Sequence, residues 1–305
     1  MPQSYDSSRW SQSIVTITTA SGENLRLNYI DCGTSLSTKP EVILLIHGFP
    51  QTSYQFRHVI TPLADAGYRV IVPDYRGAGK SSKPLTGYTK TQMAEDLHVL
   101  LTSHLEIEQK IHIIGHDIGG MIAWAYAAQY PDDVASLIWG ECPLPGTEFY
   151  EEIKGTADVF HFVFHQIQDL PEALIAGRER LYLQHVFDKM CVESAYMTPE
   201  DLEHYVLAYS QPGGIRAGLE LYRAFEKDAE ENRKMIKSNG KIMVKSVGMF
   251  GEGSFLVTKA RNMVEEVTAG EVKIVTVGGA GHYIAEEKPG TFVDEVLKNV
   301  QSAKV

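Results

Sequence analysis

Apolar residues gather in short runs along the chain, and stretches with helical periodicity separate most of these runs. Two runs near the start, 14–19 and 25–33, flank the polar stretch 21–24 and predict a β-hairpin. The later runs are apolar at nearly every position, which is typical of strands that are buried on both faces of a parallel sheet. These runs cover residues 41–48, 68–74, 111–117, 134–141, 241–248 and 272–279.

Helical stretches such as 53–67 and 89–105 lie between the strand-like runs. The order of strand, helix and strand predicts an α/β fold with a mostly parallel, doubly wound sheet and helices on both faces. A chain of 305 residues can form such a core together with an insertion.

The alternation stops between about Pro143 and Asn239, where helical patterns replace the strands. We therefore expect residues 143–239 to form an inserted helical lid, with residues 1–142 and 240–305 forming the core. In this insertion Thr198 is the expected N-cap of a helix that Pro199 begins. The charged stretch 225–240 is interpreted as a solvated helix that leads back to the core.

Charge and composition narrow the classes of partner. The formal net charge of −11 repels phosphate backbones and anionic lipids, so we expect neither nucleic acid nor a membrane surface as a partner. Three widely spaced cysteines suggest neither a disulfide framework nor a zinc site. The first residues lack the pattern of an export signal and no run is long enough to span a bilayer, so a cytoplasmic location is expected.

The segment Gly115-His116-Asp117-Ile118-Gly119 marks a sharp turn between a strand and a helix made of small residues. The turn has the G-x-S-x-G frame in which a nucleophile is lifted above the sheet, but aspartate replaces the serine. Asp117 is thus either a nucleophile or a simple cap of the following helix. Two other loops favour the nucleophile: His47–Pro50, where the Phe49 N–H can join the Ile118 N–H in an oxyanion hole, and the glycine-rich loop that carries His282.

The motifs HGFP, DYRGAGKS, GHDIGG and GAGHYIAEEKP occur in this order along nearly the whole chain, and together they resemble the α/β-hydrolase superfamily. Aspartate at the elbow is similar to the branch that contains epoxide hydrolases and dehalogenases. The resemblance implies an α/β-hydrolase fold, Asp117 as nucleophile and His282 as the general base for water. It implies no cofactor, and no metal-binding spacing is present.

The acid that supports His282 has two candidates. Glu141 follows a core strand and resembles the acid of haloacetate dehalogenases and a subset of epoxide hydrolases, whereas Glu252 lies nearer the position that most α/β-hydrolases use. We favour Glu141, because a charged residue that closes an apolar strand just before Pro143 has little structural reason to be there.

Two insertion residues resemble the groups that donate to the epoxide oxygen in epoxide hydrolases. Tyr222 matches the ring-opening tyrosine of the lid, and His161 stands where one bacterial group has histidine. Each could instead be an ordinary buried residue. His116 and His47 are interpreted as residues that brace the elbow and the oxyanion loop, and the remaining histidines, His165 among them, as surface or packing residues. The substrate pocket is expected to include Phe49, Phe162 and Ile118.

The function expected is hydrolysis of a small hydrophobic epoxide to a vicinal diol, with water as the second reactant. A haloalkane or haloacetate dehalogenase with the same nucleophile is the alternative. It is less favoured because Ile118 has no side-chain donor for a halide, and because Ile118 and Met121 replace the arginines of haloacetate dehalogenases. A receptor with this fold and little turnover is the third hypothesis. The sequence leaves the oligomeric state open, with a homodimer as one option.

Overall fold

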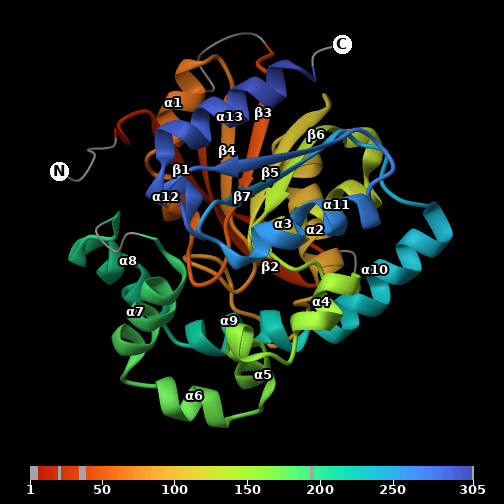
Figure 1. The fold of residues 1–305 in the computed structure, drawn as a ribbon. Coiled ribbons are helices and arrows are strands. Elements are labelled where there is room, and N and C mark those ends of the chain that lie inside the picture. The colour runs from red at the N-terminus through yellow and green to blue at the C-terminus, as the bar shows by residue number, and fades with distance from the viewer. Residues whose placement is uncertain (1–5, 20–21, 34–38, 193–195, 304–305) are drawn as a thin grey trace.

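One eight-stranded sheet organises the protein, and its strand order is β1-β2-β4-β3-β5-β6-β7-β8 (Figure 1). The computed structural model describes residues 6–19, 22–33, 39–192 and 196–303. The strands are β1 (Trp10–Thr18), β2 (Asn24–Cys32), β3 (Val42–Ile46), β4 (Arg69–Asp74), β5 (Ile111–His116), β6 (Val134–Gly140), β7 (Ser246–Gly251) and β8 (Val272–Val277). β2 is antiparallel to β1 and to β4, and the other neighbours are parallel. The predicted mostly parallel α/β fold is confirmed.

Side chains of the central strands alternate between two cores, one on each face of the sheet. Leu44 of β3 packs into one core and Leu45 into the other, because successive strand residues point to opposite faces. The first core receives residues from α2 (Lys90–Val99), α3 (Ile118–Gln129) and α11 (Ala260–Val267), and also from helices of the segment 143–239. The helices that contribute to the second core are α1 (Ile60–Asp65), α12 (Ile284–Glu287) and α13 (Pro289–Gln301).

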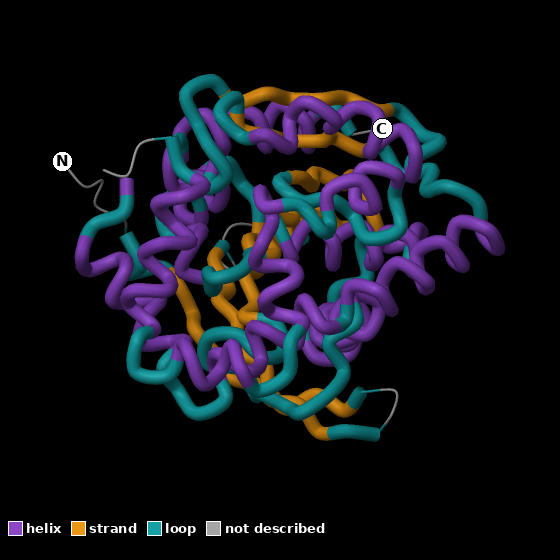
Figure 2. Tube along the Cα trace, turned by 60° about the horizontal axis from the view of Figure 1, so that its bottom comes forward, coloured by secondary structure: helices purple, strands orange, loops and turns teal. Residues whose placement is uncertain are grey.

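The described part of residues 143–239, the segment predicted as a lid, contains helices joined by turns and loops, and no strand. Its α-helices are α4 (Glu148–Ile153), α5 (Phe160–Gln166), α6 (Leu170–Ile175), α7 (Glu179–Met190), α8 (Pro199–Tyr209), α9 (Gly214–Arg223) and α10 (Phe225–Asn239). Figures 1 and 2 show them gathered beside one end of the sheet. Rings of α8 and α9 pack on Phe49, which follows β3, so this end is where the parallel strands finish.

The N-terminus of α8 forms as expected. The Thr198 hydroxyl oxygen accepts a hydrogen bond from the Asp201 N–H (3.1 Å), and the Asp201 carboxylate accepts one from the Thr198 N–H (3.1 Å). With Pro199 at the first helical position, these bonds form a capping box.

Two predicted elements have different bounds. Residues 53–67 form a short 3₁₀ segment, η1 (Ser53–Phe56), and then α1, because Pro62 has no N–H to continue a longer helix. The predicted strand 241–248 begins only at Ser246, and Met243 before it is exposed. The other short segments are η2 (Leu100–His104), η3 (Pro131–Asp133), η4 (Ala157–Val159) and η6 (Phe255–Lys259). Among the described residues, no helix is both long and apolar enough to cross a membrane.

Candidate active site

Asp117 occupies a strained corner between β5 and α3. Its φ of 55° and ψ of −124° lie in a region that residues other than glycine rarely adopt. A Cβ atom at position 119 would lie 2.1 Å from the carbonyl oxygen of Ile46, so this position requires glycine. The Asp117 side chain makes no capping hydrogen bond to α3. The geometry therefore argues against the simple cap.

Backbone N–H groups hold the Asp117 carboxylate. The Phe49 N–H donates to Oδ1 at 2.8 Å, and the Ile118 N–H is close enough to the carboxylate to affect its pKa. Burial raises the pKa of Asp117, although His282 and these two N–H groups act to lower it. The two donors predicted for the oxyanion hole thus converge on one side chain.

His282 lies between two carboxylates. Its Nδ1 is 3.0 Å from Glu141 Oε2, and its Nε2 is 3.9 Å from Asp117 Oδ2. Burial acts to lower the pKa of His282, but the hydrogen bond and charge of Glu141, followed by the charge of Asp117, raise it above the ordinary value. Nε2 is buried and has no hydrogen-bond partner among the described residues. This nitrogen is therefore available for a hydrogen bond beside Asp117.

Glu141, rather than Glu252, contacts His282. The Glu141 carboxylate is buried and also accepts hydrogen bonds from the Gly251 N–H and the Ser254 hydroxyl, both at 2.7 Å. Glu252 is exposed, and its carboxylate accepts from the Gly279 N–H at 3.0 Å. Of the two candidate acids, the structure brings only Glu141 to the histidine.

Two further histidines support the surrounding loops. His116 contacts the His282 carbonyl oxygen through Nε2 at 2.7 Å. Burial lowers the pKa of His116 well below its ordinary value, so the neutral ring donates an Nε2–H to that oxygen. His47 contacts the Gly48 carbonyl oxygen through Nδ1 at 2.9 Å. Both contacts agree with the predicted bracing roles.

The two predicted lid donors lie beside each other. The ring centroids of His161 in α5 and Tyr222 in α9 are 5.5 Å apart, and the Tyr222 ring is 5.4 Å from that of Phe49. Burial and the charge of Asp117 raise the pKa of Tyr222 well above its ordinary value, and burial lowers the pKa of His161 to about 3. The hydroxyl and the neutral imidazole therefore both keep a hydrogen that can be donated.

His165 is nearer to Tyr222 than sequence analysis suggested. Its ring centroid is 4.3 Å from that of Tyr222, and its Nε2 hydrogen-bonds the Tyr182 hydroxyl. The signal was the spacing, because His165 follows His161 by four residues and lies on the same helical face. His165 is fully buried, so it belongs to the aromatic packing around Tyr222.

A cavity of about 350 Å³ opens at the reactive groups. Asp117, Glu141, His161, Phe162 and His282 line its inner part. Residues that the sequence analysis missed also line it: Pro143, Asp158, Val159, Lys189, Met190, Cys191, Gly253, Ser254, Phe255 and Leu256.

Two of the three predicted pocket residues do not line this cavity. Phe49 and Ile118 are absent from its walls, as is Tyr222, whereas Phe162 is present. The Phe49 ring is covered by the rings of Tyr209 and Tyr222, and Ile118 is fully buried. Their side chains therefore act as packing beneath the cavity.

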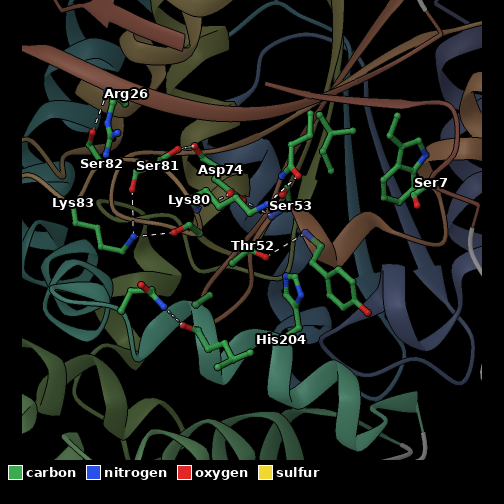
Figure 3. Close-up of a pocket in the computed structure, with 18 of the residues that line it drawn as sticks. Ser7, Arg26, Thr52, Ser53, Asp74, Lys80, Ser81, Ser82, Lys83 and His204 are labelled. Atoms are coloured by element: carbon green, nitrogen blue, oxygen red, sulfur yellow. Dashed lines mark hydrogen bonds between the residues drawn. The ribbon is translucent and has the colours of Figure 1, made fainter. Parts of the chain in front are cut away.

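A larger hollow, of about 1020 Å³, lies elsewhere and contains none of the predicted site residues. Figure 3 shows Asp74 there among Ser53, Ser81 and Lys80. The Asp74 carboxylate accepts hydrogen bonds from the Ser53 N–H (2.8 Å) and the Lys80 N–H (3.0 Å). The Asn28 side chain also donates to this carboxylate at 2.8 Å. His47 Nε2 lies 4.0 Å from Asp74 Oδ1, but the other nitrogen of that ring contacts a backbone carbonyl oxygen, whereas His282 is backed by a carboxylate.

The described part of the chain contains no group of three or more His, Cys, Asp or Glu side chains arranged to hold a metal ion. The reactive groups that the structure brings together are a carboxylate, a histidine and a second carboxylate. This arrangement suits nucleophilic attack by Asp117 followed by attack of an activated water molecule.

Comparison with known proteins gives consistent matches. Residues 41–147 match the family described as alpha/beta hydrolase fold. The chain is 33% identical over 279 residues to the soluble epoxide hydrolase of Corynebacterium sp. (strain C12), across 90% of this chain and 93% of that protein. It is 33% identical over 273 residues to the AB hydrolase superfamily protein YfhM of Bacillus subtilis (strain 168), across 85% and 90%. The solved structure of the epoxide hydrolase CorEH without ligand has a TM-score of 0.83 and 29% identity, across 96% of this chain and 100% of that chain.

Proposed function

The chain belongs to the α/β-hydrolase family, and from this premise we propose that it is an epoxide hydrolase that forms a covalent ester at Asp117. The observation that carries the proposal is the arrangement of Asp117, which is held by the Phe49 N–H (2.8 Å) and faces a histidine backed by a buried carboxylate. An aspartate in this position attacks an sp³ carbon, whereas the serine of an esterase attacks a carbonyl carbon.

In the first step, Asp117 Oδ2 attacks an epoxide carbon. Oδ1 is engaged by the Phe49 N–H, which leaves Oδ2, the oxygen that faces His282, free to form the new C–O bond. The bond from that carbon to the epoxide oxygen breaks, and the oxygen keeps the electron pair. Tyr222 and His161 stabilise the developing alkoxide by hydrogen bonds, and Tyr222 supplies the proton.

In the second step, water attacks the carbonyl carbon of the ester. His282 Nε2 takes a proton from the water, and the Phe49 and Ile118 N–H groups hold the oxyanion. The intermediate collapses when the ester bond to the substrate breaks, and the departing oxygen receives the proton from His282. The products are a vicinal diol and the Asp117 carboxylic acid, whose proton passes to the Tyr222 phenolate left by the first step, so that the Asp117 carboxylate and the Tyr222 hydroxyl are both restored.

Ester formation itself prepares His282 for this role. The charge of Asp117 is among the causes that raise the pKa of His282, and the ester is neutral. The pKa of His282 therefore falls when the ester forms, which favours the neutral imidazole that the second step requires.

The cavity sets the class of substrate. A volume of about 350 Å³ is at the lower end of the range of roughly 300–1,000 Å³ for ligand pockets. Val159, Phe162, Met190 and Leu256 form an apolar part of its wall, while Asp158 and Lys189 add charged groups outside the reactive centre. Small, hydrophobic epoxides are the expected substrates.

Intact-mass measurement of His282→Gln mixed with an epoxide tests the proposal. The expected result is an adduct equal to the whole epoxide on the Asp117 peptide, because the first step proceeds and the second is blocked. An adduct formed only from haloalkanes or haloacetate, lacking the halogen, would support a dehalogenase instead. Absence of any adduct, with wild-type turnover retained by Asp117→Asn, would refute the covalent mechanism.

A further inference from the structure

A buried ion pair connects the core to the lid next to Tyr222. Lys90 is the first residue of α2 in the core, and Asp228 lies in the first turn of α10. Their side chains are each 1% exposed, and Lys90 Nζ is 2.7 Å from Asp228 Oδ2. The Lys90 N–H also donates to Asp228 Oδ1 at 2.8 Å. The charged pattern of α10 predicts a solvated helix and gives no sign of this buried pair.

The same ammonium group also binds the backbone of α9. Lys90 Nζ donates to the carbonyl oxygen of Leu221 at 2.7 Å, and Leu221 directly precedes Tyr222. Carbonyl groups in the last turn of a helix have no partner within the helix, and a cation there is favourable. Nζ further lies 4.8 Å from the ring centroid of Phe225, whose ring is 5.0 Å from that of Tyr222. Both contacts fix the turn that carries Tyr222.

Stabilisation of the fold alone is a poor explanation for this ion pair, because taking two charges out of water costs free energy. Replacing a buried ion pair by apolar residues is often neutral or favourable for stability. Lys90 and Asp228 place their hydrogen bonds where α2, α9 and α10 meet. Such a pair defines one relative position of these helices, which an apolar contact would define less strictly.

Resting on the proposed function, we infer that Lys90 and Asp228 are positioning residues that hold Tyr222 in place for epoxide ring opening. Catalytic groups must keep their position closely, and a displacement of about 1 Å can slow a reaction roughly 100-fold. The inference therefore concerns the first chemical step, in which Tyr222 takes part, and leaves hydrolysis of the ester unaffected.

The test compares Asp228→Asn with Asp96→Asn. Asp96 is a matched control, because it lies on α2 and its equally buried carboxylate pairs with Arg76, away from α9. The rate of adduct formation is measured by rapid quench and mass spectrometry in the His282→Gln background. We expect Asp228→Asn to slow it about 10-fold or more, with little change for Asp96→Asn. Equal rates for Asp228→Asn and its parent would overturn the inference.

A second comparison separates positioning from general loss of structure. If Lys90 acts through Tyr222, Lys90→Met slows adduct formation strongly when Tyr222 is present and little in the Tyr222→Phe background. Lys90→Arg, which keeps the charge, should recover part of the rate. Additive effects of Lys90→Met and Tyr222→Phe would overturn the inference. Failure of the parent His282→Gln to form any adduct would instead count against the proposed function, so the two failures are distinguishable.

Discussion

Replacing Glu141 by glutamine should slow hydrolysis of the ester far more than its formation. The imidazolium that forms on His282 in the second step faces Glu141, with Nδ1 and Oε2 3.0 Å apart. Two such charges, with centres roughly 4 Å apart, attract by about 4 kcal/mol at an effective dielectric constant of about 20. A glutamine oxygen can still accept a hydrogen bond, which retains about 1 kcal/mol.

The remaining loss of about 3 kcal/mol corresponds to a decrease of roughly 100-fold in the rate of hydrolysis. Rapid quench with intact-mass detection measures both steps in one experiment, and the Asp117 ester should accumulate in Glu141→Gln. Glu252→Gln is the matched control, since Glu252 is exposed and its carboxylate accepts a hydrogen bond from the Gly279 N–H instead of contacting His282. Ester accumulation in Glu252→Gln, with normal hydrolysis in Glu141→Gln, would show that the wrong acid has been assigned.

The other predictions concern the lid, the pH dependence and the corner. Tyr222→Phe and His161→Phe should each slow ester formation about 10-fold or more, as followed by single-turnover mass spectrometry, and unchanged rates in both would exclude them as donors. NMR titration should give His282 a pKa above its ordinary value in the free enzyme. In the ester, Asp117 is uncharged and His282 protonates less readily, so the rate of ester hydrolysis should fall only at a lower pH. Equal pKa values of His282 in the free enzyme and in the ester would contradict this. Gly119→Ala should lower the free energy of unfolding, measured by urea denaturation, by about 3 kcal/mol, because the new Cβ would lie 2.1 Å from the Ile46 carbonyl oxygen. Gly155→Ala is the control and should leave this free energy nearly unchanged, because its new Cβ would meet nothing within 4 Å.

Sequence patterns were sufficient for the mostly parallel sheet, and Asp117, His282 and Glu141, which motifs and the resemblance suggested, lie close together in the structure. Strand runs such as 111–117 are apolar on both faces, and this pattern has one common solution, a buried parallel strand. The turn at Asp117 then follows from glycine positions that the close approach of α3 requires. The loops after parallel strands meet at one end of the sheet, so residues in the other loops, such as His282 and Glu141, were expected to lie near Asp117.

Features that depend on packing between distant segments were not predicted. Lys90 and Asp228 are 138 residues apart, and nothing in the charged pattern of α10 indicates that one of its acids is buried. The position of Phe49 outside the cavity also depends on rings from α8 and α9 that cover it. Glu141 was favoured over Glu252 from the sequence, and the structure places the Glu141 carboxylate against His282 while Glu252 is exposed.

A single turnover in ¹⁸O-labelled water tests the covalent mechanism most directly. With enzyme in excess over epoxide, water attacks the carbonyl carbon of the Asp117 ester, so the label should enter the Asp117 carboxylate, and the diol should carry an unlabelled oxygen from the protein. Mass spectrometry of the Asp117 peptide and of the diol measures both. Label in the diol with none in the peptide would show that water opens the epoxide directly and would contradict the proposed role of Asp117.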